Sequence, residues 1–578
     1  MNWLCRIFVI TLVTGLACSA ASLQALEIGA LAPPISLQTH RGVRVTLSDF
    51  ADKPAIVVAF LGTECPLAKL YGPRLQAIQQ RFEKSGVAFL GVNSNTQDSL
   101  SEIGAYISKH SITFPIVKDA GNRVADLYGA ERTPEVFVLD AQLRVRYHGR
   151  IDDQYGVGVA RDKPIREDLV IAIDELVAGK AVSNPKTESV GCHIGRVSKL
   201  EPIGDITYSN QISRIFNRRC VECHRAGELA PFTLTKFSDV IGWEDTILEV
   251  ITNKRMPPWN ANPAHGKFAN DARLTDQERD LIIGWIDNGM PQGDPAQLPE
   301  PPQFVTGWRI PQPDQIFYMR ETPFDVPAEG VVNYKHFTVE TGWTEDKYIR
   351  AAEARPENAA VVHHILVYII GDEPRRSNSR KTLVGYAPGS TPIRLKDGTA
   401  ILVPKGSKLL FQMHYTPNGT PQTDRSYCGV VFIDKQDVRQ LLNGRAPMNN
   451  RFQIPPHADN HPVTSDFVAR QDEMLVSLTP HMHLRGKSFR YEATYPDGRT
   501  EILLDVPRYD FNWQQKYVLA EPKLLPKGTK IHCTATYDNS ATNPFNPDPS
   551  ATVTWGDQSW EEMMIGFFDT IPPKPESL

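Results

Sequence analysis

Residues Thr479-Pro-His-Met-His-Leu-Arg-Gly486 place two imidazoles one position apart, directly after the strand-like run Met474-Leu-Val-Ser-Leu478. Side chains at positions i and i+2 of a strand point to the same face. His481 and His483 can therefore hold one metal ion together. An isolated His-x-His pair is more often two surface histidines, so the interpretation depends on what else the chain carries.

Other imidazole and thioether side chains accompany this pair. They are His363 and His364 on an apolar run, His414 in Phe-Gln-Met-His-Tyr, and Met563 followed by Met564. Imidazole and thioether together suit copper that cycles between two oxidation states. Adjacent side chains of a regular strand point to opposite faces, so His363 and His364 reach one ion only if the strand ends or bulges there.

In this order, the His-His, His-Tyr, His-x-His and Glu-Glu-Met motifs resemble the copper type II, ascorbate-dependent monooxygenases, over roughly residues 302–573. This is the family of peptidylglycine and dopamine β-monooxygenases. The resemblance implies two copper ions. The implied ligands are His363, His364 and His414 for the first ion, and His481, His483 and Met563 for the second, which binds dioxygen. Met482 and Met564 are alternative thioethers. The implied partners are O2, a small organic substrate and an electron donor, either an ascorbate-like reductant or a redox protein.

Two positions depart from the peptide-hydroxylating members of that family, in which an arginine and a tyrosine fix the substrate carboxylate. Thr479 and Phe567 occupy these positions here. Without a charge-assisted clamp, a peptidylglycine substrate is not expected. Cys428 and Cys533 lie where family cysteines lie, but their usual disulfide partners are absent.

The copper motifs lie in a half of the chain with repeated strand and turn signals. Short apolar runs alternate with turns such as Pro417-Asn-Gly419 and Pro496-Asp-Gly498. This pattern is typical of β-sandwiches. We expect two all-β, jelly-roll-like domains, residues 303–453 and 454–575, joined to the preceding region by a proline-rich connector.

The segment Arg219-Cys-Val-Glu-Cys-His224 is a c-type haem attachment motif. Cys220 and Cys223 are expected to bond covalently to haem c, and His224 to ligate its iron. Residues 206–293 are predicted to form a small all-α cytochrome c-like domain. Met256 resembles the methionine ligand of small c-type cytochromes, and His265 is the alternative sixth ligand.

Residues 26–192 alternate apolar strands with amphipathic helices, which predicts an α/β domain. Cys65 opens a helix after the first buried strand, a position that favours a thiolate. With Thr133-Pro134 before a later strand, the segment resembles the redoxin branch of the thioredoxin fold. The second cysteine of a Cys-x-x-Cys pair is missing. Cys192 is the nearby thiol that remains for Cys65, in a structural disulfide or in a working redox pair.

The N-terminal sequence and the composition of the chain agree with an exported protein. Residues 1–25 have the charge, apolar run and small residues of a signal peptide. The predicted location is periplasmic or secreted, with lipid anchoring at Cys18 as the lesser alternative. No later segment has membrane-spanning length. A net charge of −5 over 578 residues gives no nucleic-acid footprint and fits a multidomain chain.

Together these features predict an exported copper-dependent monooxygenase that hydroxylates an unidentified organic substrate with O2. The fused c-type haem is expected to deliver electrons to the copper-bearing half, because a short linker raises the effective concentration of donor at acceptor. The alternative is a non-catalytic periplasmic electron-transfer or copper-handling protein. A substrate cleft between the two β-domains would favour the enzyme.

Overall fold

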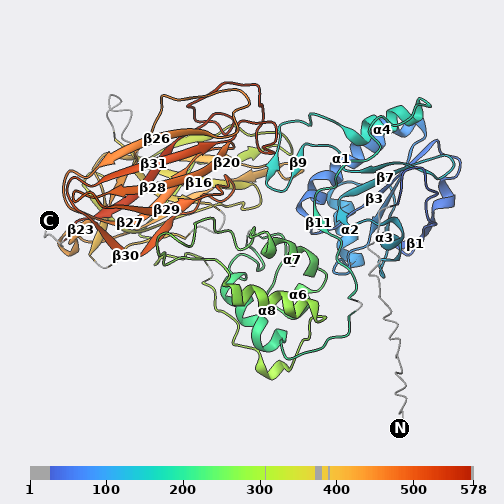
Figure 1. The fold of residues 1–578 in the computed structure, drawn as a ribbon, viewed down its shortest axis with the longest axis horizontal. Helices are drawn as coiled ribbons and strands as arrows, with labels where there is room; N and C mark the ends of the chain where they lie inside the picture. The colour runs from blue at the N-terminus through green and yellow to red at the C-terminus, as the bar shows by residue number, and fades with distance from the viewer. Residues whose placement is uncertain are drawn as a thin grey trace, which may run out of the picture.

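The protein is described by a computed structural model that covers residues 26–573 except positions 199, 229, 306, 372–380, 388–390 and 397. The predicted signal peptide lies outside the described residues. Within the described part of the chain, no helix combines the length and apolar character needed to cross a lipid bilayer. Figure 1 shows three regions: an α/β domain, a group of short helices, and a large all-β half.

The N-terminal region is a seven-stranded sheet in the order β2-β1-β5-β4-β3-β7-β8. Strand β3 sends alternate side chains into two hydrophobic cores, one on each face of the sheet. Helices α1, α2 and α4 contribute to the first core and α3 to the second. The bounds are β1 Ser36–Thr39, β2 Arg44–Thr46, β3 Ala55–Phe60, α1 Pro66–Phe82, β4 Ala88–Asn93, α2 Leu100–Lys109, β5 Ile116–Lys118, α3 Arg123–Tyr128, β6 Arg132–Thr133, β7 Glu135–Asp140, β8 Val145–Gly149, β9 Tyr155–Gly156, β10 Val159–Ala160, α4 Asp168–Val177 and β11 Cys192–His193.

The second region is a group of short helices around Trp285, which is fully buried. Its elements are η3 Tyr208–Ile212, α5 Ser213–Arg219, α6 Phe237–Val240, α7 Glu244–Thr252, α8 Asp276–Asp287 and η4 Pro295–Gln297. Helix α8 begins at a capping box in which Thr275 and Glu278 bond reciprocally to each other's backbone N–H. The helical character predicted for residues 206–293 is therefore present at both ends of the segment.

The middle of that segment differs from an all-α domain. Residues 262–269 extend along the second β-domain, where the Asn262 N–H donates to the Asp505 carbonyl at 2.8 Å and Phe268 bridges to Leu519. The cause is hydrophobic, because Trp259 and Phe268 pack into the core of that domain. The loop after Met256 therefore joins the helical region to the β half.

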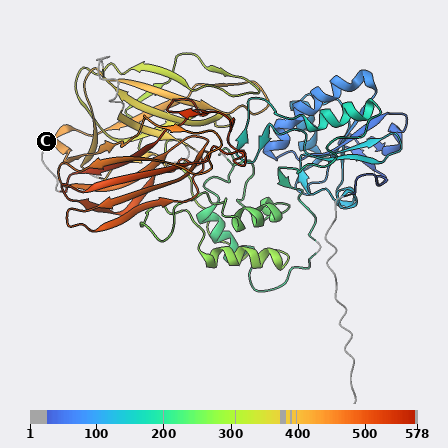
Figure 2. The ribbon, with the colours of Figure 1, turned by 45° about the horizontal axis from the view of Figure 1, so that its top comes forward.

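The β half contains two pairs of facing sheets, and the sheets of each pair share one core. Figure 2, turned from Figure 1, shows the two layers of strands. In the first pair the strands are β12 Gln315–Tyr318, β14 Lys335–Glu340, β15 Lys347–Arg355, β16 Val362–Ile370, β17 Lys381–Tyr386, β18 Ile393–Arg394, β19 Thr399–Val403, β20 Lys408–Tyr415, β22 Tyr427–Phe432 and β23 Gln440–Leu441; β13 Phe324–Val326 and β21 Gln422–Asp424 form a small separate ladder, and η5 is Lys435–Asp437.

The second pair of sheets begins earlier than the sequence suggests. Strand β24 lies before the predicted boundary at 453/454, yet it pairs with β33 of the second domain. The boundary is therefore near residue 442, since strand pairing overrides the Pro455-Pro456 signal. The strands are β24 Asn443–Arg445, β25 Gln453–Ile454, β26 His461–Val468, β27 Glu473–His481, β28 Gly486–Thr494, β29 Thr500–Val506, β30 Tyr517–Leu525, β31 Lys530–Tyr537, β32 Val553–Thr554 and β33 Ile565–Ile571.

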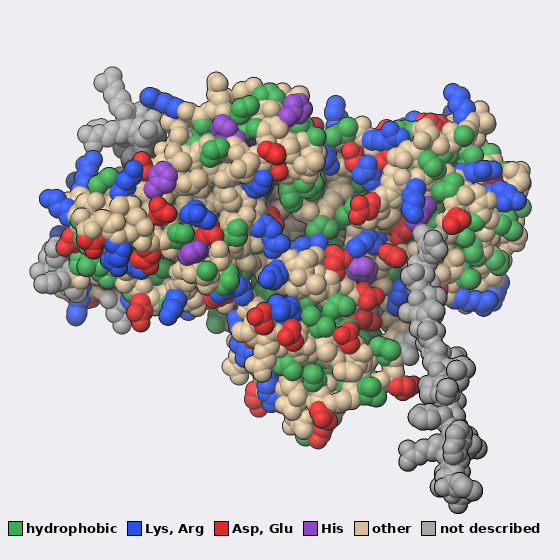
Figure 3. All heavy atoms as spheres, viewed as in Figure 1, with side chains coloured by type: hydrophobic (Ala, Val, Ile, Leu, Met, Phe, Trp, Pro, Cys, Tyr) green, Lys and Arg blue, Asp and Glu red, His purple; other side chains and the backbone are tan. Residues whose placement is uncertain are grey.

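The N-terminal domain touches both other regions. Its β9–β10 hairpin reaches the β half, where Asn512 Nδ2 donates to the Gly158 carbonyl at 3.2 Å. On another side, Arg132 pairs with Glu249 of α7 at 2.9 Å. In Figure 3, acidic and basic side chains are mixed over all three regions on the face shown.

Candidate metal and thiol sites

Three histidines converge at the edge of the first β-domain. One ring nitrogen from each of His363, His364 and His414 lies within 4.8 Å of the others. The Nδ1 atoms of His363 and His364 are 3.3 Å apart. Strand pairing explains why His414 joins this group, because His364 lies opposite His414 on the neighbouring strands β16 and β20.

A bulge in β16 brings the two adjacent histidines to one side. The pairing of β16 with β20 shifts register between Val362 and His364. This is the irregularity that the sequence requires if both imidazoles are to face one ion. His363 is half-buried, and His364 and His414 are buried.

The protonation of these imidazoles suits a metal site. Burial lowers the pKa of His363 to about 4 and lowers the pKa values of His364 and His414 well below the usual range. All three are therefore neutral at pH 7, the form that binds metal. The Nδ1 atom of His414 is buried and has no hydrogen-bond partner. A buried ring nitrogen without a hydrogen-bond partner, in a group of three imidazoles, suits a metal ligand.

The second histidine pair lies at the end of β27, with ring centroids 5.2 Å apart. His481 Nδ1 donates to Gln514 Oε1 at 2.6 Å, and His483 Nδ1 donates to the Glu561 carbonyl at 3.3 Å. Both rings are thus held through Nδ1, which leaves Nε2 of each free to bind a metal. His483 Nε2 is buried and has no hydrogen-bond partner.

The loop after this strand is fixed by a buried carboxyl group. Glu562 accepts from the backbone N–H of His483 at 2.8 Å and of Arg485 at 2.6 Å. Burial raises the pKa of Glu562 to about 8. Glu562 thus orients the His-x-His segment through its backbone.

The three methionines near this pair differ in their surroundings. Met482 and Met564 belong to the hydrophobic core of the second β-domain and are fully buried. Met563 is buried outside that core, and its carbonyl accepts from Tyr537 Oη at 2.7 Å. Of the three methionines, Met563 is therefore the one whose side chain is not part of the hydrophobic core.

The two histidine groups face each other across two aromatic rings. Phe511 lies 5.8 Å from His414 and 5.8 Å from His483, measured between ring centroids. Tyr334 lies 4.9 Å from His414 and 6.2 Å from His483. Both groups thus lie at the junction of the two β-domains.

A cavity of about 800 Å³ opens at this junction. His364 and His481 both line it, as do Thr479 and Phe567, the residues at the altered clamp positions. Apolar side chains from β16, β17 and β19 form much of its wall. A cleft between the two β-domains is the feature that would favour an enzyme over a non-catalytic metal protein.

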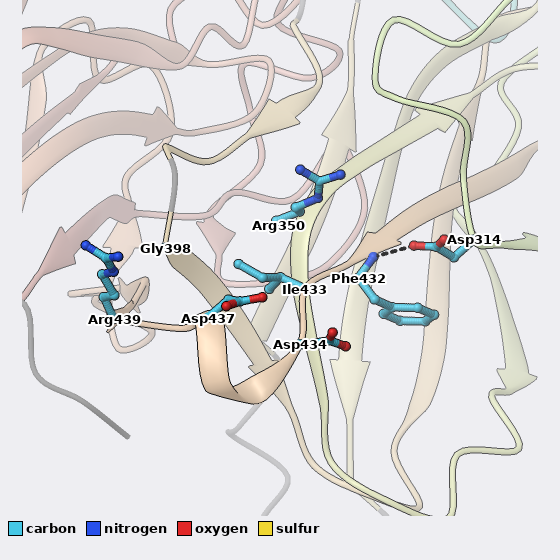
Figure 4. Close-up of a pocket in the computed structure, with 8 residues that line it drawn as sticks. All are labelled: Asp314, Arg350, Gly398, Phe432, Ile433, Asp434, Asp437 and Arg439. Carbon is cyan, nitrogen blue, oxygen red and sulfur yellow. Dashed lines mark hydrogen bonds between the residues drawn. The ribbon is translucent and has the colours of Figure 1, made fainter.

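A second hollow, of about 830 Å³, lies beside β22 and η5. Figure 4 shows Arg350 and Arg439 on it, with Asp314 bonded to the Phe432 backbone N–H at 2.7 Å. Among the described residues, no histidine, cysteine or methionine lines it, in contrast to the junction cavity.

The predicted haem motif lies where α5 ends. Cys220 and Cys223 are half-buried thiols, and His224 Nδ1 donates to the Phe232 carbonyl at 3.0 Å. This bond leaves Nε2 of His224 available for iron.

Of the two candidate sixth ligands, Met256 lies in the loop after α7, which ends at Thr252, and its N–H donates to the Val250 carbonyl at 3.0 Å. His265 lies in the segment that docks on the second β-domain.

The two cysteines of the N-terminal domain lie together. Cys65 is the residue before α1, is fully buried, and its thiol donates to the Thr133 carbonyl at 2.9 Å. Cys192 is opposite Thr133 in the β6–β11 pair and hydrogen-bonds to Cys65. The Thr133–Pro134 bond is cis, as the redoxin resemblance implies. Cys428 and Cys533 are buried separately in the two β cores.

Several residues that build these sites were not predicted from the sequence. Gln514, Tyr334 and Phe511 follow no motif spacing, and each reaches a histidine through tertiary packing. Glu562 belongs to the Glu-Glu-Met motif, but its bond to the His483 backbone was not predicted. Only the tertiary structure identifies them.

Comparison with known proteins identifies the N-terminal region. The AhpC/TSA family profile matches residues 28–148. Chloroplastic peroxiredoxin Q from Sedum lineare is 28% identical over 119 residues, which are 19% of this chain and 62% of that protein. The thiol-disulfide oxidoreductase ResA from Geobacillus thermodenitrificans is 27% identical over 122 residues, 21% of this chain and 68% of that protein.

Among solved structures, a hypothetical protein from Sinorhizobium meliloti is 31% identical, with 30% of this chain and 97% of that chain covered and a TM-score of 0.29. The chain spans less than two thirds of the first curated relatives, 62% and 57% of two peroxiredoxin Q proteins. The N-terminal region is a thioredoxin-like redoxin domain. The copper and haem predictions concern the other regions and stay predictions.

Proposed function

We propose that the β half of this chain is a copper-dependent monooxygenase that hydroxylates an organic substrate, and that the helical region carries haem c. The observation that carries the proposal is the meeting of three neutral imidazoles within 4.8 Å, beside a cavity lined by His364 of this group and by His481 of the second histidine pair. Two copper ions, held as the sequence predicts, would supply one-electron redox chemistry and activation of dioxygen.

The chain's own residues prepare the two ligand groups. In the first, His363, His364 and His414 stay neutral because they are buried, so no proton competes with a metal ion at pH 7. In the second, Gln514 and the Glu561 carbonyl hold Nδ1 of the two rings, which fixes the tautomer that presents Nε2.

Met563 supports a copper site in particular. With His481 and His483, the Met563 thioether would make a softer ligand set than zinc or magnesium usually takes, one that suits the reduced form of copper. Met482 and Met564 serve the hydrophobic core instead.

The junction cavity would bind the substrate and keep water away from the histidines. Leu366, Leu383 and Phe567 are among its apolar wall residues. Thr479 and Phe567 offer no charge where the peptide-hydroxylating enzymes hold a carboxylate. The wall at Phe567 therefore favours apolar contact with the substrate, and Lys381, Arg445 and Lys516 also line the cavity.

Haem c on Cys220 and Cys223 would add a one-electron donor. His224 is prepared as an iron ligand because its Nδ1 is already bonded to the Phe232 carbonyl. The loop that follows Met256 docks on the second β-domain through Asn262 and Phe268. This contact keeps the helical region against the copper-bearing half.

The test is oxygen uptake by the full-length, copper-loaded, haem-containing protein with ascorbate as reductant. Extract fractions serve as the substrate panel, and mass spectrometry identifies products that have gained an oxygen atom. We expect His483→Ala to abolish substrate-dependent uptake. His532→Ala is the matched control, because His532 is an exposed histidine of the same β-domain that pairs with Asp466.

Equal uptake in the wild type and in His483→Ala would contradict the proposal. The chain would then be better described by the alternative, a non-catalytic electron-transfer or copper-handling protein.

A further inference from the structure

We propose that Cys65 and Cys192 form a reversible disulfide that exchanges electrons with a dithiol partner, with attack at Cys192 and departure of the Cys65 thiolate. This site lies in the redoxin domain and uses none of the proposed copper or haem ligands, so it goes beyond the function proposed above. Four features of the structure carry it.

The first feature is the placement of the Cys192 strand. Strand β11 pairs antiparallel with β6, and Cys192 lies opposite Thr133, the residue before the cis proline. The neighbouring Gly191 permits this approach, because a Cβ there would lie only 2.0 Å from the Thr133 carbonyl oxygen. Strand β11 thus places the Cys192 thiol at the N-terminal end of α1, where Cys65 lies.

The second feature is how this segment is held. The Ile194 N–H donates to the Glu131 carbonyl at 2.8 Å, and the Thr96 N–H donates to the Gly195 carbonyl at 2.9 Å. An added Cβ at Gly195 would lie 2.0 Å from Gln97 Oε1. The segment after Cys192 is therefore packed closely on the domain, which keeps the two thiols together in the reduced protein.

The third feature is the difference between the two sulfurs. Cys65 is fully buried, whereas Cys192 is half-buried. Burial raises the pKa of Cys65, but hydrogen bonds from the Cys192 thiol and backbone outweigh it, and the pKa falls to about 6. The bond to Cys65 and burial raise the pKa of Cys192 well above its usual value. An incoming thiolate thus meets the more exposed sulfur, and the better leaving group is the buried one.

The fourth feature is the charged junction around Cys192. His193 Nε2 lies 2.7 Å from Glu249 of α7, which also pairs with Arg132 and Arg255 at 2.9 Å each. Figure 1 places β11 on the side of the redoxin domain near α7. The bond to Cys65 and burial still raise the pKa of Cys192, but the Arg132 and Arg255 guanidinium groups oppose that rise, so they favour a Cys192 thiolate during exchange.

The exchange balances without any further reactant. One thiolate of the dithiol attacks Cys192 Sγ, the Cys65–Cys192 bond breaks, and Cys65 leaves as a thiolate that takes up a proton. The second thiol of the partner loses its proton and attacks the partner sulfur that is bonded to Cys192. This closes the partner's disulfide and releases Cys192 as a thiolate, which takes up a proton. Two electrons and two protons pass to the protein, and the dithiol becomes a disulfide.

The test is a redox titration of the native full-length protein in mixtures of reduced and oxidised dithiothreitol. After acid quenching and denaturation, a maleimide mass tag counts the free thiols. We expect the count to change by two across the titration, with a single midpoint. Cys65→Ser and Cys192→Ser should each lose that change completely.

Two results would overturn the proposal. One is a disulfide that excess dithiothreitol reduces only after the protein is unfolded, which would make it structural. The other is a count that never falls in excess oxidised dithiothreitol. The direction of attack has its own readout: mixed disulfides trapped with a chromogenic aromatic thiol should map to the Cys192 peptide, and adducts mainly on Cys65 would refute that direction.

Discussion

Replacing Gln514 with leucine should weaken copper binding at the second histidine group and leave the first group unchanged. Gln514 Oε1 accepts from His481 Nδ1 at 2.6 Å, and no other side chain is bonded to that ring nitrogen among the described residues. Leucine has a similar volume but no acceptor. The His481 ring then loses the bond that fixes its tautomer and orientation.

The expected magnitude follows from the role of such partners. Loss of a hydrogen bond to a metal-bound histidine lowers metal affinity about 10- to 100-fold, which is about 1.4–2.7 kcal/mol. The assay is a competition titration of the apoprotein with a coloured Cu(I) chelator, which resolves two binding steps. We expect only the step assigned to His481 and His483 to shift.

Gln515→Leu is the matched control, because Gln515 lines the same cavity but donates to the Pro258 carbonyl instead of meeting a histidine. An affinity within twofold of the wild type in Gln514→Leu would refute the assignment of Gln514. Equal weakening of both steps would show that the two groups are one site.

Three further predictions concern the helical region. Full-length protein should stain for haem peroxidase activity on a denaturing gel, and Cys220→Ala with Cys223→Ala should abolish the stain; colour that survives would refute covalent haem. Met256→Ala should remove the methionine-to-iron absorption band of the oxidised haem, whereas loss of that band in His265→Ala would identify the other ligand. Glu278→Gln should destabilise the helical region by about 1–3 kcal/mol at pH 7, because hydrogen bonds from the Thr275 backbone and from two arginines outweigh burial and lower the pKa of Glu278 to about 2. The lowered pKa of Glu278 gives the wild type extra stability above about pH 4.5, and this stability is lost as the pH falls toward 2. Denaturant unfolding followed by circular dichroism should therefore show the two proteins becoming equally stable at low pH. A stability difference that does not change with pH would contradict this account.

Much of the fold follows from local sequence patterns. The apolar run that forms β3 and the cysteine after it predicted the redoxin domain, because both signals are local in the chain. The capping box of Thr275 and Glu278 is an equally local signal for the start of α8 at Asp276. The pairing of strands depends on residues far apart in the chain. Strand β24 therefore joins the second β-domain by pairing with β33, although Pro455 and Pro456 suggest a later boundary.

The candidate sites divide in the same way. The order of the motifs, through the family resemblance that it carries, named the candidate ligands, and the need for a bulge at His363 and His364 followed from strand geometry alone. The acceptor for His481 could not be found, because Gln514 lies in a loop between strands and reaches the ring only through tertiary packing. The docking of Phe268 on β30 was also missed, since it depends on the shape of a distant core.

Copper content of the purified, copper-loaded protein tests the central claim most directly. We predict two copper ions per chain in the wild type. His414→Ala and His483→Ala should each retain one, because their ligand groups come from different β-domains on either side of Phe511. A wild-type protein without bound copper, or a single substitution that removes both ions, would contradict the account.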